Sequence, residues 1–294
     1  MSLRTRLVKR LLRFQLAGWS EGPIREQRAR QERSTRFGRL PADVRCWHTS
    51  ANGVAAEWIE AGDADMGVIL YLHGGAYALG SIDTHREFVA RLARAAGMRA
   101  LAIDYRLAPE HPFPAALKDV TAAYGWLQTQ GVAPSRIIVA GDSAGGGLAL
   151  AALLELRNAG KPLPAGAVCI SPWVDLTLSG DSIQGKAQAD CILDPSSLEM
   201  YAAYYAGEHD RASPLISPLF ADLSGLPPLL IQVGMDEILL DDAKRCAERA
   251  RQAGVDVTLE IWDEMFHVFQ LFPFLPETKE AVGHIAEFGL GLIR

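Results

Sequence analysis

A serine between glycines is the first feature of this sequence that could do covalent chemistry. The stretch "GDSAGG" at residues 141–146 contains the pattern Gly-x-Ser-x-Gly, centred on Ser143. In this pattern the serine stands on a strained turn from a strand into a helix, which exposes its hydroxyl as a nucleophile. Gly141 and Gly145 leave room for the neighbouring backbone, and the amino end of the helix favours developing negative charge. The alternative is a glycine-rich helix start that a serine caps.

A nucleophilic serine of this kind needs a histidine base later in the chain. His267 lies five residues after the predicted strand 256–262, in the stretch "EMFHVF". It alone follows both the serine and an acidic turn and also lies at the end of a strand, so we expect it to be the base. A buried core histidine beside two phenylalanines is the alternative. The remaining histidines occupy other predicted positions: His48, His73, His85, His111, His209 and His284.

The acid that orients this histidine should lie in the turn after the predicted strand "PLLIQVG". The turn reads "MDEILLDD", and because Asp236 and Glu237 are adjacent in it, at most one of them faces His267. Asp241 and Asp242 suit the start of the next helix, where negative charge interacts favourably with the helix dipole. Spacing alone leaves both Asp236 and Glu237 open.

Two glycines after the apolar run 67–73 predict an anion-binding turn. Attack of a serine on an acyl carbon creates an oxyanion. It needs backbone N–H donors that are not already hydrogen-bonded within a β-sheet. Gly74 and Gly75 can turn their amides to that point without a side chain in the way, and Ala144 after the nucleophile can supply another. An ordinary turn is the alternative, but it would not explain why the glycines coincide with a nucleophile turn.

These residues would be positioned by alternating strands and helices. Short apolar runs predict strands at 54–60, 67–73, 98–105, 136–142, 166–171, 228–234 and 256–262. Helical patterns cover 84–96, 115–129, 144–159, 241–253 and 275–292. The alternation predicts an α/β fold, with a mostly parallel central sheet flanked by helices and chemistry at the carboxyl ends of the strands.

Two segments fall outside this alternation and predict a helical cap, formed by about residues 1–40 and 178–225. Residues 1–41 carry a net charge of +8, whereas the remainder carries −14. A basic amphipathic terminus could touch a membrane. We favour helices packed over an acidic body, because Leu7, Leu11 and Phe14 have the spacing of an ordinary packed helix face.

Composition limits the partners and the cellular location. The net charge of −6 argues against nucleic acid as the main partner. We expect no stable membrane insertion, because no apolar run is long enough to span a bilayer, and charged residues interrupt the N-terminal apolar stretch where a signal peptide would lie. The scattered cysteines predict reduced thiols in a cytoplasmic protein and no metal site. They are Cys46, Cys169, Cys191 and Cys246.

Taken together, the motifs resemble those of the bacterial hormone-sensitive-lipase family of α/β-hydrolase carboxylesterases, in its GDSAG subgroup. The segments that carry the resemblance run from about residue 45 to the end: "HGGAY", "DYRLAPEHPFPA", "GDSAGG", "SPWVDLT" and "MFHVF". The resemblance implies an α/β-hydrolase fold with a helical cap and no cofactor. Many members have a third glycine where Ala76 stands, and because alanine keeps its N–H, we expect the oxyanion hole to survive.

The resemblance also implies roles for single residues. Ser143 matches the nucleophile and His267 the base, and the oxyanion-hole donors match at Gly74, Gly75 and Ala144. The family's acid is followed two residues later by Leu and four residues later by Asp, a frame that Glu237 fits and Asp236 does not.

We therefore expect a carboxylesterase that hydrolyses small esters of short or medium acyl chains through an acyl-enzyme. An amidase or formamidase on the same scaffold is an alternative. A non-catalytic small-molecule receptor is another, and the presence of His267 argues against it. The strand 256–262 is expected at an apolar sheet edge, which makes a homodimer possible.

Overall fold

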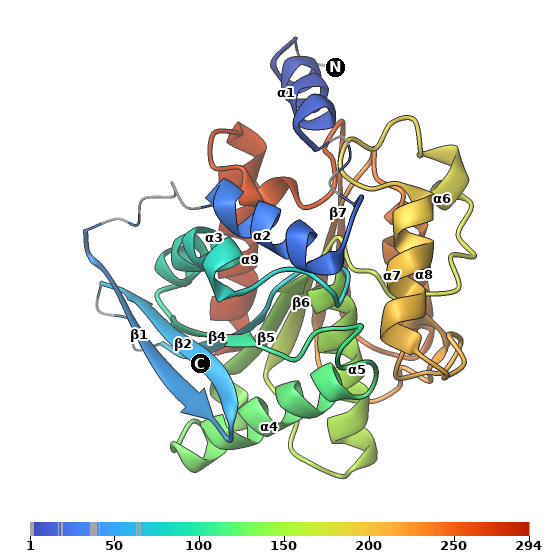
Figure 1. Ribbon diagram of the computed structural model, residues 1–294. Helices are drawn as coiled ribbons and strands as arrows, with labels where there is room; N and C mark the ends of the chain where they lie inside the picture. The colour runs from blue at the N-terminus through green and yellow to red at the C-terminus, as the bar shows by residue number, and fades with distance from the viewer. Residues whose placement is uncertain are drawn as a thin grey trace.

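The computed structural model describes residues 3–16, 18, 20–35, 40, 42–62, 64 and 66–293. Within these residues, eight strands form one sheet in the order β1-β2-β4-β3-β5-β6-β7-β8 (Figure 1). The β1–β2 and β2–β4 pairs are antiparallel, and every other neighbouring pair is parallel. The predicted α/β fold with a mostly parallel sheet is therefore confirmed.

The strands largely follow the predicted apolar runs. Their bounds are β1 Val44–Ala51, β2 Val54–Ala61, β3 Val68–Leu72, β4 Arg99–Asp104, β5 Ile137–Asp142, β6 Gly166–Ile170, β7 Leu229–Gly234 and β8 Val257–Trp262. Strands β3, β5, β6 and β7 are buried along their whole length, because helices cover both faces of the sheet there. Strand β1, which the sequence patterns did not predict, lies at one edge, and β8 forms the predicted edge on the other side.

Helices pack on both faces of the sheet. One layer holds α3 (Ile82–Ala96) and α9 (Pro276–Leu292), whose apolar side chains share a core with one face. The other layer holds α4 (Ala115–Thr129), α5 (Ala144–Asn158) and α8 (Leu240–Gln252), which share the larger core. Both termini of α3 have local signals: a capping box formed by Ser81 and Thr84 begins it, and Gly97 at φ +59° ends it.

The remaining helices belong to the two segments outside the regular alternation. They are α1 Leu3–Leu16, α2 Ile24–Thr35, α6 Ser182–Gly185 and α7 Pro195–Ala206. Short 3₁₀ turns occupy η1 Pro134–Arg136, η2 Pro218–Phe220 and η3 Phe269–Leu271. Between β6 and β7 the structure describes every residue and contains no strand, as the sequence predicted. Part of the expected N-terminal cap segment, residues 1, 2, 17, 19 and 36–39, lies outside the described residues.

The packing of α1 corrects one expectation. Leu7, Leu11 and Phe14 were expected to pack inward, but they are 70%, 54% and 84% exposed. The helix instead buries Leu12 and Lys9. Apolar spacing alone does not say which face of a short helix with several apolar residues turns inward, and here the inward face carries Lys9, which pairs with Asp236.

Two further expectations concern the cysteines and membrane-spanning segments. All four cysteines are unpaired. Among the described residues, no helix is both long and apolar enough to cross a membrane.

Candidate active site

The turn at Ser143 joins β5 to α5 in a strained conformation. The residue has φ +53° and ψ −120°, and its side chain caps no amide of the helix. A β-carbon at Gly141 would lie 2.4 Å from the carbonyl oxygen of Gly145, and one at Gly145 would lie 2.0 Å from that of Leu72. Glycine is therefore required on both sides of Ser143, because the helix start passes directly against neighbouring backbone. The turn leaves the Ser143 hydroxyl at the amino end of α5, where it makes no capping hydrogen bond to the helix.

His267 lies in the loop after β8 and is bound to an acid from the next loop of the sheet. Its Nδ1 is 2.8 Å from Oε2 of Glu237, which follows β7. His267 is only 2% exposed and Glu237 is fully buried. A carboxylate can only accept here, so Nδ1 carries the proton and Nε2 remains for proton transfer.

The carboxylate of Glu237 is held by two further donors. The hydroxyl of Ser171 donates to its Oε1 at 2.7 Å, and the N–H of Gly234 donates to the same oxygen. The Ser171 oxygen in turn accepts the N–H of Val268 at 3.2 Å. Ser171 thus connects the acid to the backbone beside His267, a role that sequence reasoning missed although "SPW" lies at the end of a predicted strand.

The environment of His267 favours its charged form. Burial alone would lower its pKa, but the hydrogen bond to Glu237 and the negative charges of Glu237, Asp190 and Asp142 outweigh burial and raise the pKa above 6.5. An imidazolium at this position would therefore be stabilised by its surroundings.

Asp236, the other candidate acid, points elsewhere. Its carboxylate forms an ion pair with Lys9 of α1, and its N–H donates to the carbonyl of Met265 at 3.0 Å. Asp241 and Asp242 lie in the first turn of α8, as expected. The carboxylate of Asp242 is fully buried and accepts the N–H groups of Val174 and Asp175.

The loop after β3 differs from expectation at Gly74. Its N–H donates to Oδ1 of Asp142 at 2.9 Å, so this amide is already engaged. A β-carbon at Gly74 would lie 2.1 Å from the other oxygen of the same carboxylate. Glycine at 74 therefore leaves room for the Asp142 carboxylate. The Gly74 amide was expected to bind an oxyanion, but its bond to Asp142 leaves it unavailable.

Other amides of this region are unused. Among the described residues, no acceptor pairs with the N–H of Gly75, Ala76 or Ala144. Gly75 and Ala76 have φ of +120° and +53°, so the chain turns sharply after Gly74. A β-carbon at Gly75 would lie 2.3 Å from the carbonyl of Leu79, which explains glycine there. Unpaired amides near a nucleophile are the donors that an oxyanion needs.

Asp142, the residue before Ser143, holds this loop through its carboxylate. It accepts the hydroxyl of Tyr71 at 2.6 Å, and its carboxylate lies 3.4 Å from Nε2 of His85. Burial raises the pKa of Asp142, but the charge and hydrogen bond of His85 and the hydroxyl of Tyr71 outweigh burial and lower it. The carboxylate is therefore ionised, and it ties Gly74 to the nucleophile turn.

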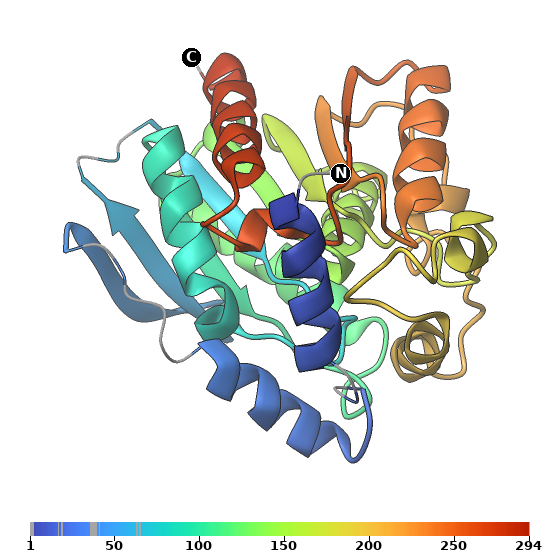
Figure 2. The ribbon, with the colours of Figure 1, turned by 90° about the horizontal axis from the view of Figure 1, so that it is seen from above.

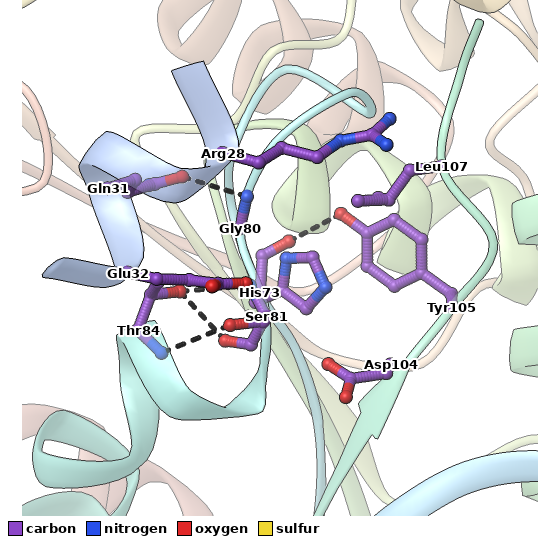
Figure 3. A pocket seen from close by; sticks show the side chains of 10 residues that line it. All are labelled: Arg28, Gln31, Glu32, His73, Gly80, Ser81, Thr84, Asp104, Tyr105 and Leu107. Carbon is purple, nitrogen blue, oxygen red and sulfur yellow. Dashed lines mark hydrogen bonds between the residues drawn. The ribbon is translucent and has the colours of Figure 1, made fainter. Parts of the chain in front are cut away.

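His73 is braced by Tyr105. The two rings stack at 4.2 Å, and the Tyr105 hydroxyl donates to the His73 carbonyl at 2.7 Å (Figure 3). Both residues line a small cavity of about 190 Å³, to which α2 contributes Arg28, Gln31 and Glu32 (Figure 3). His73 therefore supports the loop that carries Gly74 and Gly75.

A larger cavity of about 720 Å³ brings the candidate residues together. Ser143, His267 and the loop 74–76 all line it. Helices α1, α2 and α7 supply much of the remaining wall, which is mostly apolar. Its apolar members are Leu12, Leu16, Leu79, Ile192, Leu193, Leu198, Tyr201, Val268, Leu271 and Phe272.

Of the aromatic residues of α7, which are Tyr201, Tyr204 and Tyr205, only Tyr201 lines this cavity. Tyr205 is buried and stacks on Tyr77, with ring centroids 3.7 Å apart. Met200 and Tyr204 pack, partly buried, against the larger core. Most of this stripe therefore packs α7 onto the sheet layers.

The site brings together a candidate nucleophile, a candidate base with its acid, and unpaired amides around one cavity. Among the described residues, no cluster of three or more His, Cys, Asp or Glu is placed to hold a metal ion. The chemistry that these groups support is attack by a serine hydroxyl on an acyl carbon.

Comparison with known proteins gives a consistent result. A family model described as alpha/beta hydrolase fold matches residues 69–271. An acetyl-hydrolase of Streptomyces hygroscopicus is 47% identical over 266 residues, which cover 89% of this chain and 88% of that protein. An esterase of Acinetobacter venetianus is 42% identical over 242 residues, which cover 82% of this chain and 80% of that protein. A crystal structure of an esterase from the bacterial hormone-sensitive lipase family is 47% identical, with a TM-score of 0.96 over 100% of this chain and 99% of that one.

Proposed function

The chain belongs to the alpha/beta hydrolase family, in its bacterial hormone-sensitive lipase branch, and on this basis we propose that it is a serine carboxylesterase acting through Ser143. The family membership and the named relatives establish a carboxylic ester hydrolase. The observation that carries the serine mechanism is the buried Glu237–His267 pair, which shares one cavity with the strained Ser143 turn.

In the first half of the reaction, the Ser143 hydroxyl attacks the ester carbonyl carbon and Nε2 of His267 takes its proton. Glu237 holds the imidazolium that forms. The carbonyl oxygen becomes an oxyanion and accepts N–H groups of Gly75, Ala76 and Ala144. When the tetrahedral intermediate collapses, the C–O bond to the alcohol breaks, and the alcohol leaves with the proton from His267.

In the second half, water attacks the acyl group on Ser143. His267 takes a proton from this water and returns it to Ser143 as the carboxylic acid leaves, so the enzyme is regenerated. Gly74 acts in both halves through its bond to Asp142, which positions the following two amides.

The preferred esters carry short to medium acyl chains. The cavity is large enough for such an ester, and its walls are mostly apolar beyond the reacting groups. The proposed cap is formed by about residues 1–40 and 178–225. Its helices α1, α2 and α7 supply walls of the cavity opposite the strand ends. The chain length that fits best is set by these cap residues.

Turnover of p-nitrophenyl butyrate tests this proposal. We expect Ser143→Ala to reduce kcat by about 10⁴-fold or more, because the nucleophile is lost while binding remains. Equal activity of the variant and the parent would refute the serine mechanism. A matched p-nitroanilide of butyric acid distinguishes an esterase from an amidase, and we expect hydrolysis of the ester to dominate.

A further inference from the structure

Helix α1 turns an apolar stripe to solvent. Leu7, Leu11 and Phe14 are spaced by four and three residues, so they lie on one side of the helix, and they are 70%, 54% and 84% exposed. The opposite side buries Lys9 and Leu12, which are 5% and 8% exposed. A helix that buries a lysine and exposes two leucines and a phenylalanine is inverted relative to an ordinary surface helix.

Specific contacts fix this inverted orientation. The Lys9 ammonium forms an ion pair with Asp236, and the two side chains are only 6% and 17% exposed. The guanidinium of Arg13 donates to the carbonyls of Gln188 and Ala189 at 2.6 and 2.9 Å. Leu12 belongs to the apolar cluster beneath the helix. The helix cannot roll its apolar stripe inward without breaking the buried ion pair.

An apolar stripe held outward in this way marks a contact surface. Figures 1 and 2 show α1 on the outside of the molecule, at the top in Figure 1 and towards the viewer in Figure 2. Single exposed apolar residues elsewhere on the surface need no explanation. Three apolar side chains on one side of a helix would normally be buried, and that burial would stabilise the helix.

The charge of the helix indicates what covers the stripe. The α1 sequence contains five basic residues and no acidic one, and of these Lys9 and Arg13 are bonded to the body of the protein. Arg10, one residue before Leu11, is exposed beside the stripe. Two copies of this helix related by a twofold axis would bring like charges together. A lipid surface with anionic headgroups satisfies both the apolar stripe and its basic border.

We propose that the stripe of Leu7, Leu11 and Phe14, bordered by Arg10, docks the enzyme peripherally on anionic phospholipid surfaces. The remainder of the chain beyond residue 41 carries a net charge of −14, so an anionic surface attracts the α1 side and repels the rest. The same helix supplies Leu12, Gln15 and Leu16 to the wall of the large cavity. Docking therefore places the helix that walls the cavity against the lipid, where apolar esters partition.

Co-sedimentation with vesicles tests the docking surface directly. The full chain is mixed at low ionic strength with vesicles of phosphatidylcholine alone or with about one-third phosphatidylglycerol. The test variant combines Leu7→Ser, Leu11→Ser and Phe14→Ser, none of which lines the cavity. The control combines Met66→Ser, Phe220→Ser and Ile261→Ser, three residues that are 43%, 37% and 36% exposed elsewhere on the surface. Arg10→Gln tests the charge separately, because it removes one charge and leaves the apolar stripe intact.

We expect the parent and the control to bind the anionic vesicles, with at least fivefold weaker binding to phosphatidylcholine alone. The α1 triple variant should bind at least tenfold more weakly, and Arg10→Gln about threefold to fivefold more weakly, since one basic residue near an anionic surface contributes about that factor. Turnover of dissolved p-nitrophenyl butyrate should stay unchanged in the triple variant, which shows that it is folded.

Three results would overturn the proposal: no binding of the parent to anionic vesicles, equal binding of the parent and the triple variant, or a dimer of the parent that the triple variant converts to a monomer without any vesicle binding. The last result would identify the stripe as a contact between copies. Sedimentation needs no turnover, so these outcomes are independent of the serine mechanism.

Discussion

The hydroxyl of Ser171 is expected to matter for catalysis although it touches no substrate. It donates to Oε1 of Glu237 at 2.7 Å and accepts the N–H of Val268 at 3.2 Å. Ser171→Ala removes one of the two donors on that oxygen and leaves the Val268 N–H unpaired in a buried place. Glu237 is then less firmly oriented towards His267.

The size of the effect follows from the charge of the acceptor. A hydrogen bond to a charged group contributes about 1.5–3 kcal/mol, and each 1.4 kcal/mol of transition-state stabilisation corresponds to about tenfold in rate. If most of this bond acts when the imidazolium forms, kcat/KM of Ser171→Ala should fall about 10- to 100-fold. The fall should appear mainly in kcat, because Ser171 is not among the residues that line the cavity.

Ser182→Ala is the matched control. Ser182 is also a buried serine, its hydroxyl donates to the carbonyl of Ile238 at 2.7 Å, and it accepts the N–H of Asp241 at 3.0 Å. Its loss should lower thermal stability by a similar amount but reduce kcat/KM less than threefold. The assay is p-nitrophenyl butyrate hydrolysis, with thermal unfolding of each variant as a reference. If Ser171→Ala keeps kcat/KM within about twofold of the parent, or if Ser182→Ala loses as much, the positioning role is refuted.

Three further predictions concern the same site. Against the effect of burial, the hydrogen bond to Glu237 and nearby carboxylates raise the pKa of His267. Because the base must be neutral to act, kcat/KM should rise with pH through a midpoint above 6.5. A midpoint below 6 would contradict this prediction. Glu237→Gln should reduce kcat at least 100-fold and move this midpoint to lower pH. Asp236→Asn should keep kcat within a few fold but lower the free energy of unfolding by roughly 2–4 kcal/mol, because Lys9 is left buried without its charged partner. The reverse pattern in kinetics and urea unfolding would assign the acid to Asp236. Gly145→Ala should prevent folding or greatly destabilise the protein, since its β-carbon would lie 2.0 Å from the Leu72 carbonyl oxygen, and a variant whose melting temperature equals that of the parent would show that the helix start can move.

The sequence predicted those parts of the fold that depend on local pattern. Fully buried strands such as β5 read as continuous apolar runs, and the Gly-x-Ser-x-Gly stretch is both a turn signal and a chemical one. Strand β1 was missed because its residues "VRCWHTSA" alternate only weakly and it is stabilised mainly by pairing with β2.

Contacts between residues distant in the chain were beyond the sequence patterns. The bond from Gly74 to Asp142 joins residues 68 positions apart, and the pair of Lys9 and Asp236 joins residues 227 apart. The first of these engages the Gly74 amide, and the second is one of the contacts that hold the inward face of α1. The choice between Asp236 and Glu237 likewise stayed open on spacing alone and depends on where each carboxylate points in the folded chain.

Covalent labelling tests most directly whether the hydroxyl of Ser143 and the imidazole of His267 act together. The purified protein is incubated with diethyl p-nitrophenyl phosphate, and the modified residue is located by mass spectrometry of the intact chain and its peptides. We expect one diethylphosphoryl group per chain on Ser143, no label on Ser143→Ala, and labelling at least 100-fold slower in His267→Asn. A label on a different residue, or labelling of Ser143 at an undiminished rate without His267, would contradict the proposed catalytic arrangement.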